Sequence, residues 1–114
     1  MPFKVVGIDE FNKEYDELKA SASDGDSGNS ELLKKLDKAV TKLKQNYRAG
    51  KHVPKDRIPE YYAVRYGVTN LWKLDLDKNY RLIYTLRGTS VEIMCVLLEF
   101  FDHKKYSKRF GYKK

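Results

Sequence analysis

Apolar and polar residues alternate through the C-terminal half of the chain, and this period of two restricts the fold more than any other feature. Residues 72–77 alternate strictly, and after a two-residue turn residues 80–86 alternate again. A second turn leads into residues 91–101, which are almost all apolar. Because neighbouring side chains of a strand point to opposite faces, the pattern predicts three antiparallel strands. The last of them is expected to be central and covered on both faces.

Spacings of three and four residues replace this alternation in the N-terminal half and predict two helices. Residues 9–23 place a Phe, a Tyr and a Leu on one face, and the turn-forming residues 23–30 end that helix. The second helix has an apolar stripe more than four turns long, and we expect Ser30 to cap its start and Gly50 to close its end. Together these segments predict a helical hairpin that packs on one face of the sheet.

The remaining segments complete an α+β architecture. Residues 2–9 alternate weakly and predict a short first strand. Residues 51–60 contain two prolines, so we expect no regular structure there and extended chain from Tyr61 onward. The element order predicts one α+β domain over residues 1–114. Its expected parts are a mostly antiparallel four-stranded sheet, the helical hairpin and a short basic C-terminal helix or tail.

Charge is divided unevenly along the chain. Residues 1–41 hold six Lys against nine Asp and Glu, a net charge of −3, whereas residues 42–114 hold seventeen Lys and Arg against seven acids, a net charge of +10. A one-sided basic excess attracts a polyanion, and counterion release makes nucleic acid the leading candidate. Ordinary solubility charge is the alternative.

The apolar segments predict a protein of the cytoplasm. None of them approaches the roughly 20 residues of a membrane span, and the N-terminus lacks the apolar core of a signal peptide. The single cysteine, Cys95, lies in an apolar run, where a small buried side chain in a reducing compartment is expected.

Motifs for metal, phosphate-loop or nucleophile chemistry are not found in the sequence. It has no Gly-rich phosphate loop and no CxxC, and His52 and His103 lack neighbours at metal-ligand spacing. No serine or cysteine nucleophile with a paired base is visible. We therefore expect neither a metal site nor a cofactor.

Basic and proton-exchanging residues are instead expected at neighbouring positions of the sheet. Lys73 lies on the strand face opposite the apolar residues. Arg81 begins the next strand, where it should lie near Lys73 or Asp75 across the ladder. The last strand ends at His103 and Lys104, which a central strand could bring towards the same face.

Such a group suits the cleavage of RNA by attack of a ribose 2′-hydroxyl on the adjacent phosphate. The reaction needs proton transfer, which His or Tyr can perform, and cations around the phosphorane, which Arg and Lys supply; it needs no metal. Simpler structural roles are the alternatives. Arg81 can pair with Asp75 on the same sheet face. Tyr106 can pack on Phe110, and the last cations of the chain can form a solvated tail.

The order of these segments resembles the RelE/ParE superfamily of bacterial and archaeal toxins. Its signature is an aromatic-Lys-aliphatic strand, a tight turn, a strand of the form Tyr-Arg-aliphatic-aliphatic-Tyr, and a final strand that ends in a basic segment before a tyrosine. The corresponding pieces are Leu71–Leu76, Tyr80–Tyr84 and His103–Tyr106. The resemblance covers nearly the whole chain and implies a RelE-like fold.

The resemblance also implies a function: a toxin of a type II toxin–antitoxin system that cleaves mRNA on the ribosome as a metal-independent endoribonuclease. Its partners would be the mRNA on the ribosome and a cognate antitoxin protein. The implied catalytic residues are Arg81, His103, Tyr106, Lys73 and Lys104. The residues expected to contact RNA are Lys55, Arg57, Arg65, Lys105, Arg109 and Tyr112.

Two departures from the family pattern keep other functions open. Asp75 stands where the RelE branch commonly has a second Lys or Arg, and the spacing from His103 to Tyr106 is one residue shorter than the pattern. Tyr112 is therefore a second candidate for the functional tyrosine. The alternatives are a ParE-like inhibitor of DNA gyrase that cuts nothing and an inactive homologue that binds RNA or antitoxin.

Overall fold

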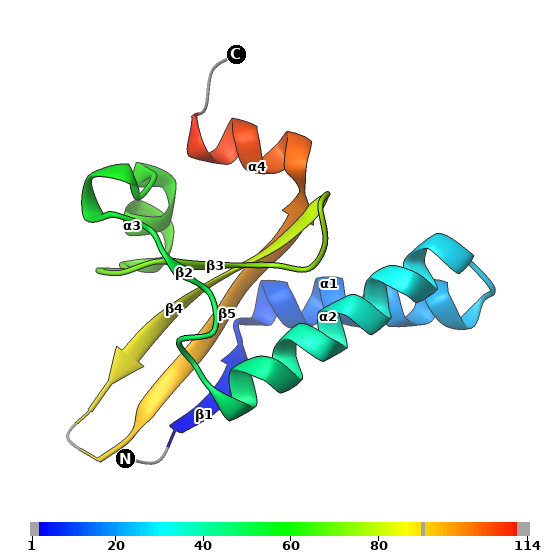
Figure 1. Cartoon of the computed structure of the whole chain (residues 1–114), viewed down its shortest axis with the longest axis horizontal. Helices are drawn as coiled ribbons and strands as arrows, with labels where there is room; N and C mark the ends of the chain where they lie inside the picture. Colours follow the sequence, from blue (N-terminus) through cyan, green and yellow to red (C-terminus); the bar gives the residue numbers. More distant parts are fainter. Residues whose placement is uncertain (1–2, 90, 112–114) are drawn as a thin grey trace.

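The computed structural model describes residues 3–89 and 91–111, which form an α+β fold with a mixed sheet (Figure 1). The elements in chain order are β1 (Phe3–Gly7), α1 (Asp9–Ser23), α2 (Ser27–Gln45), β2 (Lys51–His52), a 3₁₀ turn η1 (Lys55–Arg57), α3 (Glu60–Tyr66), β3 (Trp72–Asp75), β4 (Tyr80–Gly88), β5 (Ile93–Asp102) and α4 (His103–Phe110). The expected α+β class is confirmed.

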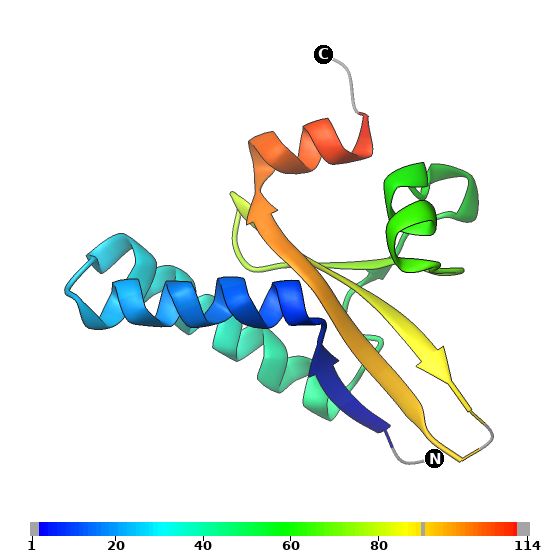
Figure 2. The same cartoon turned by 180° about the vertical axis from the view of Figure 1, so that it is seen from behind.

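The sheet has five strands in the order β1-β5-β4-β3-β2. Seen from behind, β1 lies beside β5 at one edge of the sheet (Figure 2). The strand β1 runs parallel to β5, and the other neighbours are antiparallel. β5 lies inside the sheet, as its apolar sequence predicts. The expected count of four strands was wrong because the two-residue strand β2 pairs with the outer edge of β3.

The helical hairpin packs on one face of the sheet. Leu36 and Leu43 of α2 are fully buried against Leu82 and Tyr84 of β4. The predicted ends of α2 were wrong. The helix is capped by Asp26, whose carboxylate accepts the Asn29 backbone N–H at 2.9 Å, and it ends at Gln45.

Gly50 has a different role from the expected helix end. Its backbone passes so close to β3 that an added Cβ would lie 2.5 Å from the Lys73 carbonyl oxygen. Its N–H donates to the Tyr84 hydroxyl at 3.0 Å. The glycine therefore allows the chain that leaves α2 to approach the sheet closely and begin β2.

The opposite face of the sheet is partly covered by α3 and α4 (Figure 1). The expectation of extended chain from Tyr61 onward was wrong. Pro59 precedes α3, and Gly67 ends it in the left-handed region at φ 64°. Tyr62 is fully buried from α3, and Tyr106 is buried from α4. Both belong to a second apolar cluster with Ile83 of β4 and Val96, Leu98 and Phe101 of β5.

A register shift in β5 changes which face its side chains occupy. Ile83 of β4 pairs with Glu99, whereas the next residue, Tyr84, pairs with Leu97, so Leu98 is an extra residue. Such a bulge reverses the alternation beyond it. Leu97 therefore lies in the hairpin cluster, while Glu99, the partner of Ile83, faces α3 and α4.

Candidate functional site

The strand ladder places two of the predicted cations on the α4 face of the sheet. Arg81 pairs directly with Asp75 across β3 and β4. Lys73 is two residues from Asp75 in β3, and side chains two residues apart share a face. The contacts of both cations with α4 show that this is the face opposite the helical hairpin.

The start of α4 determines where its first turn lies. Asp102 ends β5 and caps α4, because its carboxylate accepts the Lys105 backbone N–H at 2.9 Å. His103 and Tyr106 lie three residues apart and therefore on the same side of α4. Tyr106 is only 2% exposed, and its ring stacks on Phe110 with 4.5 Å between centroids.

Four predicted residues meet at this point, and we call Lys73, Arg81, His103 and Tyr106 the α4 cluster. The Lys73 Nζ donates to the Tyr106 hydroxyl at 2.8 Å. The Arg81 Cζ lies 4.4 Å from the centre of the Tyr106 ring. The Arg81 Nη1 lies 3.0 Å from the His103 Nδ1. Three elements, β3, β4 and α4, thus contribute to one group of cations and proton-exchanging side chains.

The contact between Arg81 and His103 determines the tautomer of the imidazole. A guanidinium has only donors, so the His103 Nδ1 must accept. The proton of a neutral His103 is therefore on Nε2. His103 is exposed, which leaves this N–H able to donate to a ligand.

Arg81 also forms an ion pair with Asp75, as the structural alternative predicted. The Arg81 Nε lies 3.0 Å from the Asp75 Oδ1. The Nε is buried, yet among the described residues no acceptor is aligned for a hydrogen bond to it. The Arg81 side chain is 20% exposed and that of Asp75 is 60% exposed. The carboxylate is thus the more accessible member of the pair.

Lys104 lies beside the α4 cluster rather than in it. An open groove runs along the start of α4, lined by Asn79, Tyr80, Asp102, His103, Lys104, Ser107 and Lys108. His103 is the cluster member that reaches this groove. A phosphate in the groove could therefore meet an imidazole N–H and lysine side chains.

The residues expected to contact RNA are divided among several places. Lys55 and Arg57 are exposed on η1, and Lys105 is exposed on α4. Tyr112 lies outside the described residues. Sequence reasoning overlooked Lys51, which pairs with Lys73 across β2 and β3 and so lies on the same face. Its signal was hidden because residues 51–60 do not show strand periodicity.

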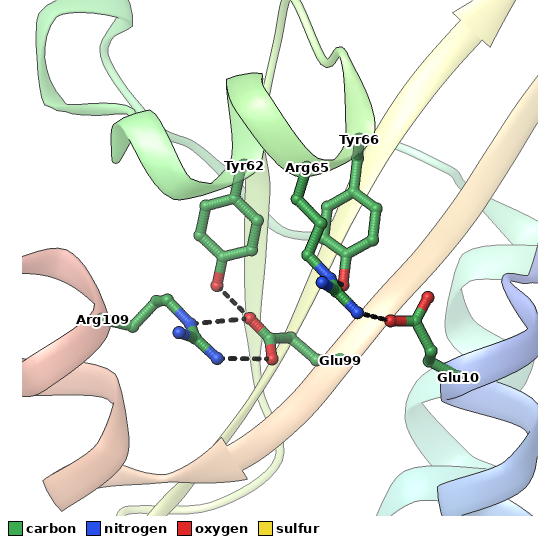
Figure 3. A network of polar contacts seen from close by, with 6 residues as sticks. All are labelled: Glu10, Tyr62, Arg65, Tyr66, Glu99 and Arg109. Atoms are coloured by element: carbon green, nitrogen blue, oxygen red, sulfur yellow. Dashed lines mark hydrogen bonds and ion pairs between the residues drawn. The ribbon is translucent and has the colours of Figure 1, made fainter.

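Arg65 and Arg109, which were expected to contact RNA, each form an ion pair with a carboxylate of the fold. Arg65 forms an ion pair with Glu10 of α1 and donates to the Tyr66 hydroxyl (Figure 3). Arg109 donates from Nε and Nη2 to the two carboxylate oxygens of Glu99, at 3.1 and 3.2 Å. Both guanidinium groups thus connect elements of the fold.

Glu99 and Tyr62 are polar residues that sequence reasoning did not single out. The Tyr62 hydroxyl donates to the Glu99 Oε2 at 2.5 Å (Figure 3). Burial and the neighbouring Glu99 carboxylate raise the pKa of Tyr62 well above its usual range, so the hydroxyl keeps its proton. The available signal was a lone acid within an apolar strand, because a buried charge requires partners.

Two further properties concern the described residues as a set. Within 3–89 and 91–111, no three His, Cys, Asp or Glu side chains gather in a way that could hold a metal ion. In the same ranges, no helix has the length and apolar character needed to cross a membrane.

Comparisons with known proteins identify the family. Residues 9–98 match the family model described as the ParE toxin of the type II toxin–antitoxin system parDE. A solved structure of a YoeB/ParE toxin from Agrobacterium tumefaciens is similar, with a TM-score of 0.56 and 14% sequence identity over 88% of this chain and 98% of that chain. At this identity the likeness shows the fold alone. No curated protein matches the chain. The predicted resemblance is confirmed: the chain belongs to the ParE toxin family of type II toxin–antitoxin systems.

Proposed function

We propose that this toxin is a metal-independent endoribonuclease that cleaves mRNA on the translating ribosome, in the cytoplasm. The products would be a 2′,3′-cyclic phosphate or 3′-phosphate and a 5′-hydroxyl. The observation that carries the proposal is the α4 cluster, in which an exposed imidazole contacts an arginine that lies next to a lysine. Cations beside a proton carrier are what 2′-hydroxyl attack on a phosphate requires.

Arg81 would bind the phosphate first, and His103 would then transfer the protons. The guanidinium matches the geometry of two phosphate oxygens. When a phosphate takes the place of His103 on Arg81, the Nδ1 lone pair of the imidazole becomes available. It can then accept the proton of the 2′-hydroxyl, and the imidazolium so formed can return a proton to the leaving 5′-oxygen. Arg81 would stabilise the charge that builds on the phosphorane.

In this proposal Tyr106 contacts the cations Lys73 and Arg81 and does not contact the RNA. Its side chain is 2% exposed, so its hydroxyl does not reach an RNA bound at the surface. That hydroxyl instead accepts from Lys73, and its ring lies beneath Arg81. Tyr106 is thus a positioning residue, and Lys73 and Lys104 would attract the phosphate.

Primer extension on a translated mRNA tests the reaction. His103→Gln should keep ribosome binding and lower the cleavage rate by roughly 10²–10⁴-fold, the usual range for acid–base catalysis. Arg81→Ala should lower the cleavage rate more than the affinity, because its interaction strengthens in the transition state. His52→Gln is the matched control, since His52 packs on Trp72 with 5.0 Å between ring centroids, on the face opposite the cluster. Full cleavage by His103→Gln would reject this mechanism.

Salt dependence tests the binding surface separately. The exposed cations include Lys51 of β2, Lys55 of η1, and Lys104 and Lys105, which lie between His103 and Tyr106 in α4. Affinity for ribosomes or RNA should fall steeply as salt rises, because counterions are released on binding. Lys104→Glu should weaken binding. Affinity that is indifferent to salt would contradict an RNA surface.

A gyrase inhibitor is the second candidate, favoured by two observations. The matching family model is named for ParE, and Arg81 already has Asp75 as a counter-ion. A binding protein needs no proton carrier, so His103→Gln would retain its full effect. Inhibition of DNA supercoiling by purified gyrase, with translated mRNA left intact, would replace the nuclease proposal. Activity in neither assay, with antitoxin binding retained, would indicate an inactive homologue.

The family implies an antitoxin partner. We propose that an acidic or amphipathic segment of the antitoxin covers the basic face formed by residues of β3, β4 and α4. Adding a helix or strand to such a surface is a common mode of peptide recognition. Charge reversal at Lys104 should then weaken antitoxin binding as well as RNA binding.

A further inference from the structure

A buried carboxylate on β5 connects three elements of the fold. Glu99 is 6% exposed and accepts from Tyr62 of α3 and from Arg109 of α4 (Figure 3). Each carboxylate oxygen receives at least one of these hydrogen bonds. Glu99 thus makes hydrogen bonds from the inner strand β5 to both short helices, α3 and α4.

Arg109 is held on two sides. Its guanidinium meets Glu99 through two parallel N–H groups, and its Cζ lies 3.7 Å from the centre of the Tyr61 ring. Its side chain is only 21% exposed. A bidentate pair fixes orientation as well as distance, because both N–H groups must stay aligned.

Arg109 lies in the last turn of α4, so its ion pair with Glu99 affects the direction of the helix. α4 has eight residues, about 12 Å at 1.5 Å per residue, and so short a helix is not stable alone. The Asp102 cap fixes its first turn, and Arg109 lies near its other end. Between them, Tyr106 anchors the helix in the second apolar cluster, and its ring stacks on Phe110. The bidentate pair of Arg109 adds a directional attachment near the end of α4, so it contributes to the direction in which His103 points.

We propose that Glu99 and Arg109 are positioning residues whose ion pair orients α4 and so holds the His103 imidazole with its Nδ1 facing Arg81, where a phosphate bound to Arg81 would meet it. The inference rests on the proposed role of His103 as the proton carrier. A buried ion pair stabilises a fold little compared with apolar residues of the same volume, but its geometry is directional. Loss of this ion pair should therefore change the orientation of His103 in addition to any change in the free energy of unfolding.

Glu99→Gln is the primary variant, because it keeps the shape of the side chain and removes the bidentate acceptor. Glu99 is buried, so a change in activity cannot come from a lost RNA contact. Glu10→Gln is the matched control, since Glu10 forms the neighbouring ion pair with Arg65 and does not touch α4 (Figure 3). Tyr62→Phe removes one donor to the same carboxylate and is the second variant if Glu99→Gln fails to fold.

The spectroscopic test is ¹⁵N NMR of the imidazoles at a pH where both are neutral. The chain has two histidines, so His52 is an internal reference in every spectrum. In the unaltered protein and in Glu10→Gln, His103 should show the Nε2–H tautomer alone. In Glu99→Gln its two nitrogen signals should move towards each other as the tautomers exchange, with His52 unchanged, and Tyr62→Phe should give a smaller shift in the same direction. A His103 that keeps one tautomer in both variants would overturn the inference.

A kinetic test follows from the same variants. Glu99→Gln should lower kcat by up to about 10²-fold, as expected for a displaced catalytic group, with KM little changed. Glu10→Gln should keep the kcat of the unaltered protein. If the unaltered protein cleaves no RNA, the proposed function fails and the NMR result alone decides the inference. If cleavage is normal in Glu99→Gln, the inference fails and the proposed function stands.

Discussion

The two faces of the sheet are built in different ways. The face under α1 and α2 is covered by helices of 15 and 19 residues and closed by an apolar cluster. The face under α3 and α4 is covered by helices of 7 and 8 residues, and beside its own apolar cluster it contains the buried polar side chains Glu99 and Thr85. Apolar burial stabilises without fixing direction, whereas hydrogen bonds fix direction and add little net stability. The first face therefore stabilises the fold, and the second can hold reactive groups in a set geometry.

The buried side chains of Thr85 and Glu99 on the second face have specific partners. The Thr85 hydroxyl donates to the Asn70 carbonyl oxygen at 2.7 Å, and Glu99 accepts from Tyr62 and Arg109. Removing the partner of a buried polar group lowers the free energy of unfolding by more than the net contribution of the hydrogen bond itself. The comparison predicts that changes on the hairpin face affect stability and that changes on the α4 face affect orientation.

Leu36→Ala should have the largest effect on stability. Leu36 is fully buried between the hairpin and the sheet, so the variant creates a cavity. We expect a loss of about 2–5 kcal/mol in the free energy of unfolding, measured by urea titration. The cleavage rate per folded molecule should be unchanged. A large fall in that rate would show that the two faces are coupled more strongly than the comparison allows.

The two aspartate caps give a matched pair. Asp26 caps α2 on the hairpin face and Asp102 caps α4 on the other, each accepting a backbone N–H at 2.9 Å. Replacing either by Ala should cost about 0.5–2 kcal/mol in the free energy of unfolding. Only Asp102→Ala should also slow the proposed RNA cleavage, because α4 then loses the cap of the turn that contains His103. Equal activity of the two variants would contradict the division between the faces.

Tyr84→Phe should remove about 1 kcal/mol of stability at neutral pH, since the variant loses the hydrogen bond from Gly50. Burial raises the pKa of Tyr84 to about 12. The native state therefore binds the proton of the Tyr84 hydroxyl more tightly than the unfolded chain does. The free energy of unfolding falls as the pH rises from about 10 through the native pKa. Urea titrations between pH 8 and pH 11 should show a weaker alkaline decline in Tyr84→Phe. An unchanged decline would place its origin in other groups whose pKa burial raises, such as Cys95 and Tyr62.

The smallest expected effect belongs to the ion pair between Lys35 of α2 and Asp77 in the turn before β4. The Lys35 Nζ lies 2.8 Å from the Asp77 Oδ2, and this hydrogen bond, followed by the backbone N–H of Asn79, lowers the pKa of Asp77. A lowered native pKa gives stability that is present above the ordinary pKa of about 4 and is lost as the pH falls through the native value. In Asp77→Asn, the free energy of unfolding should fall slightly less steeply as the pH is lowered below about 4. Added salt should reduce the difference, because the pair is partly exposed.

Much of the hairpin face could be predicted from the sequence. The apolar stripe of α2 and the apolar faces of residues 71–77 and 80–86 predict that the helix packs on the sheet. Each would otherwise leave its apolar side chains exposed to water. The placement of Lys73 opposite Trp72 follows from the period of two. The ends of α2 could not be predicted, because Asp26 and Ser30 are both good caps and local preference does not choose between them.

Less of the α4 face could be predicted. Prolines at 54 and 59 hid a two-residue strand and a helix, since both elements depend on contacts with distant residues more than on local pattern. Arg65 and Arg109 looked like free cations because their partners, Glu10 and Glu99, lie 55 and 10 residues away in sequence. A charge pattern reports the number of cations but not which carboxylate each one meets.

The sequence alone determined the α+β class, the family resemblance and the grouping of Lys73 with Arg81, because strand period and ladder register are local properties of the chain. The tertiary structure decided, among other features, where Glu99 points, through one irregularity in β5. The extra residue Leu98 in β5 turns Glu99 towards α3 and α4. No period in the sequence marks that bulge, since the strand is apolar on both faces. Only packing against the second pair of helices selects the side on which the buried carboxylate lies.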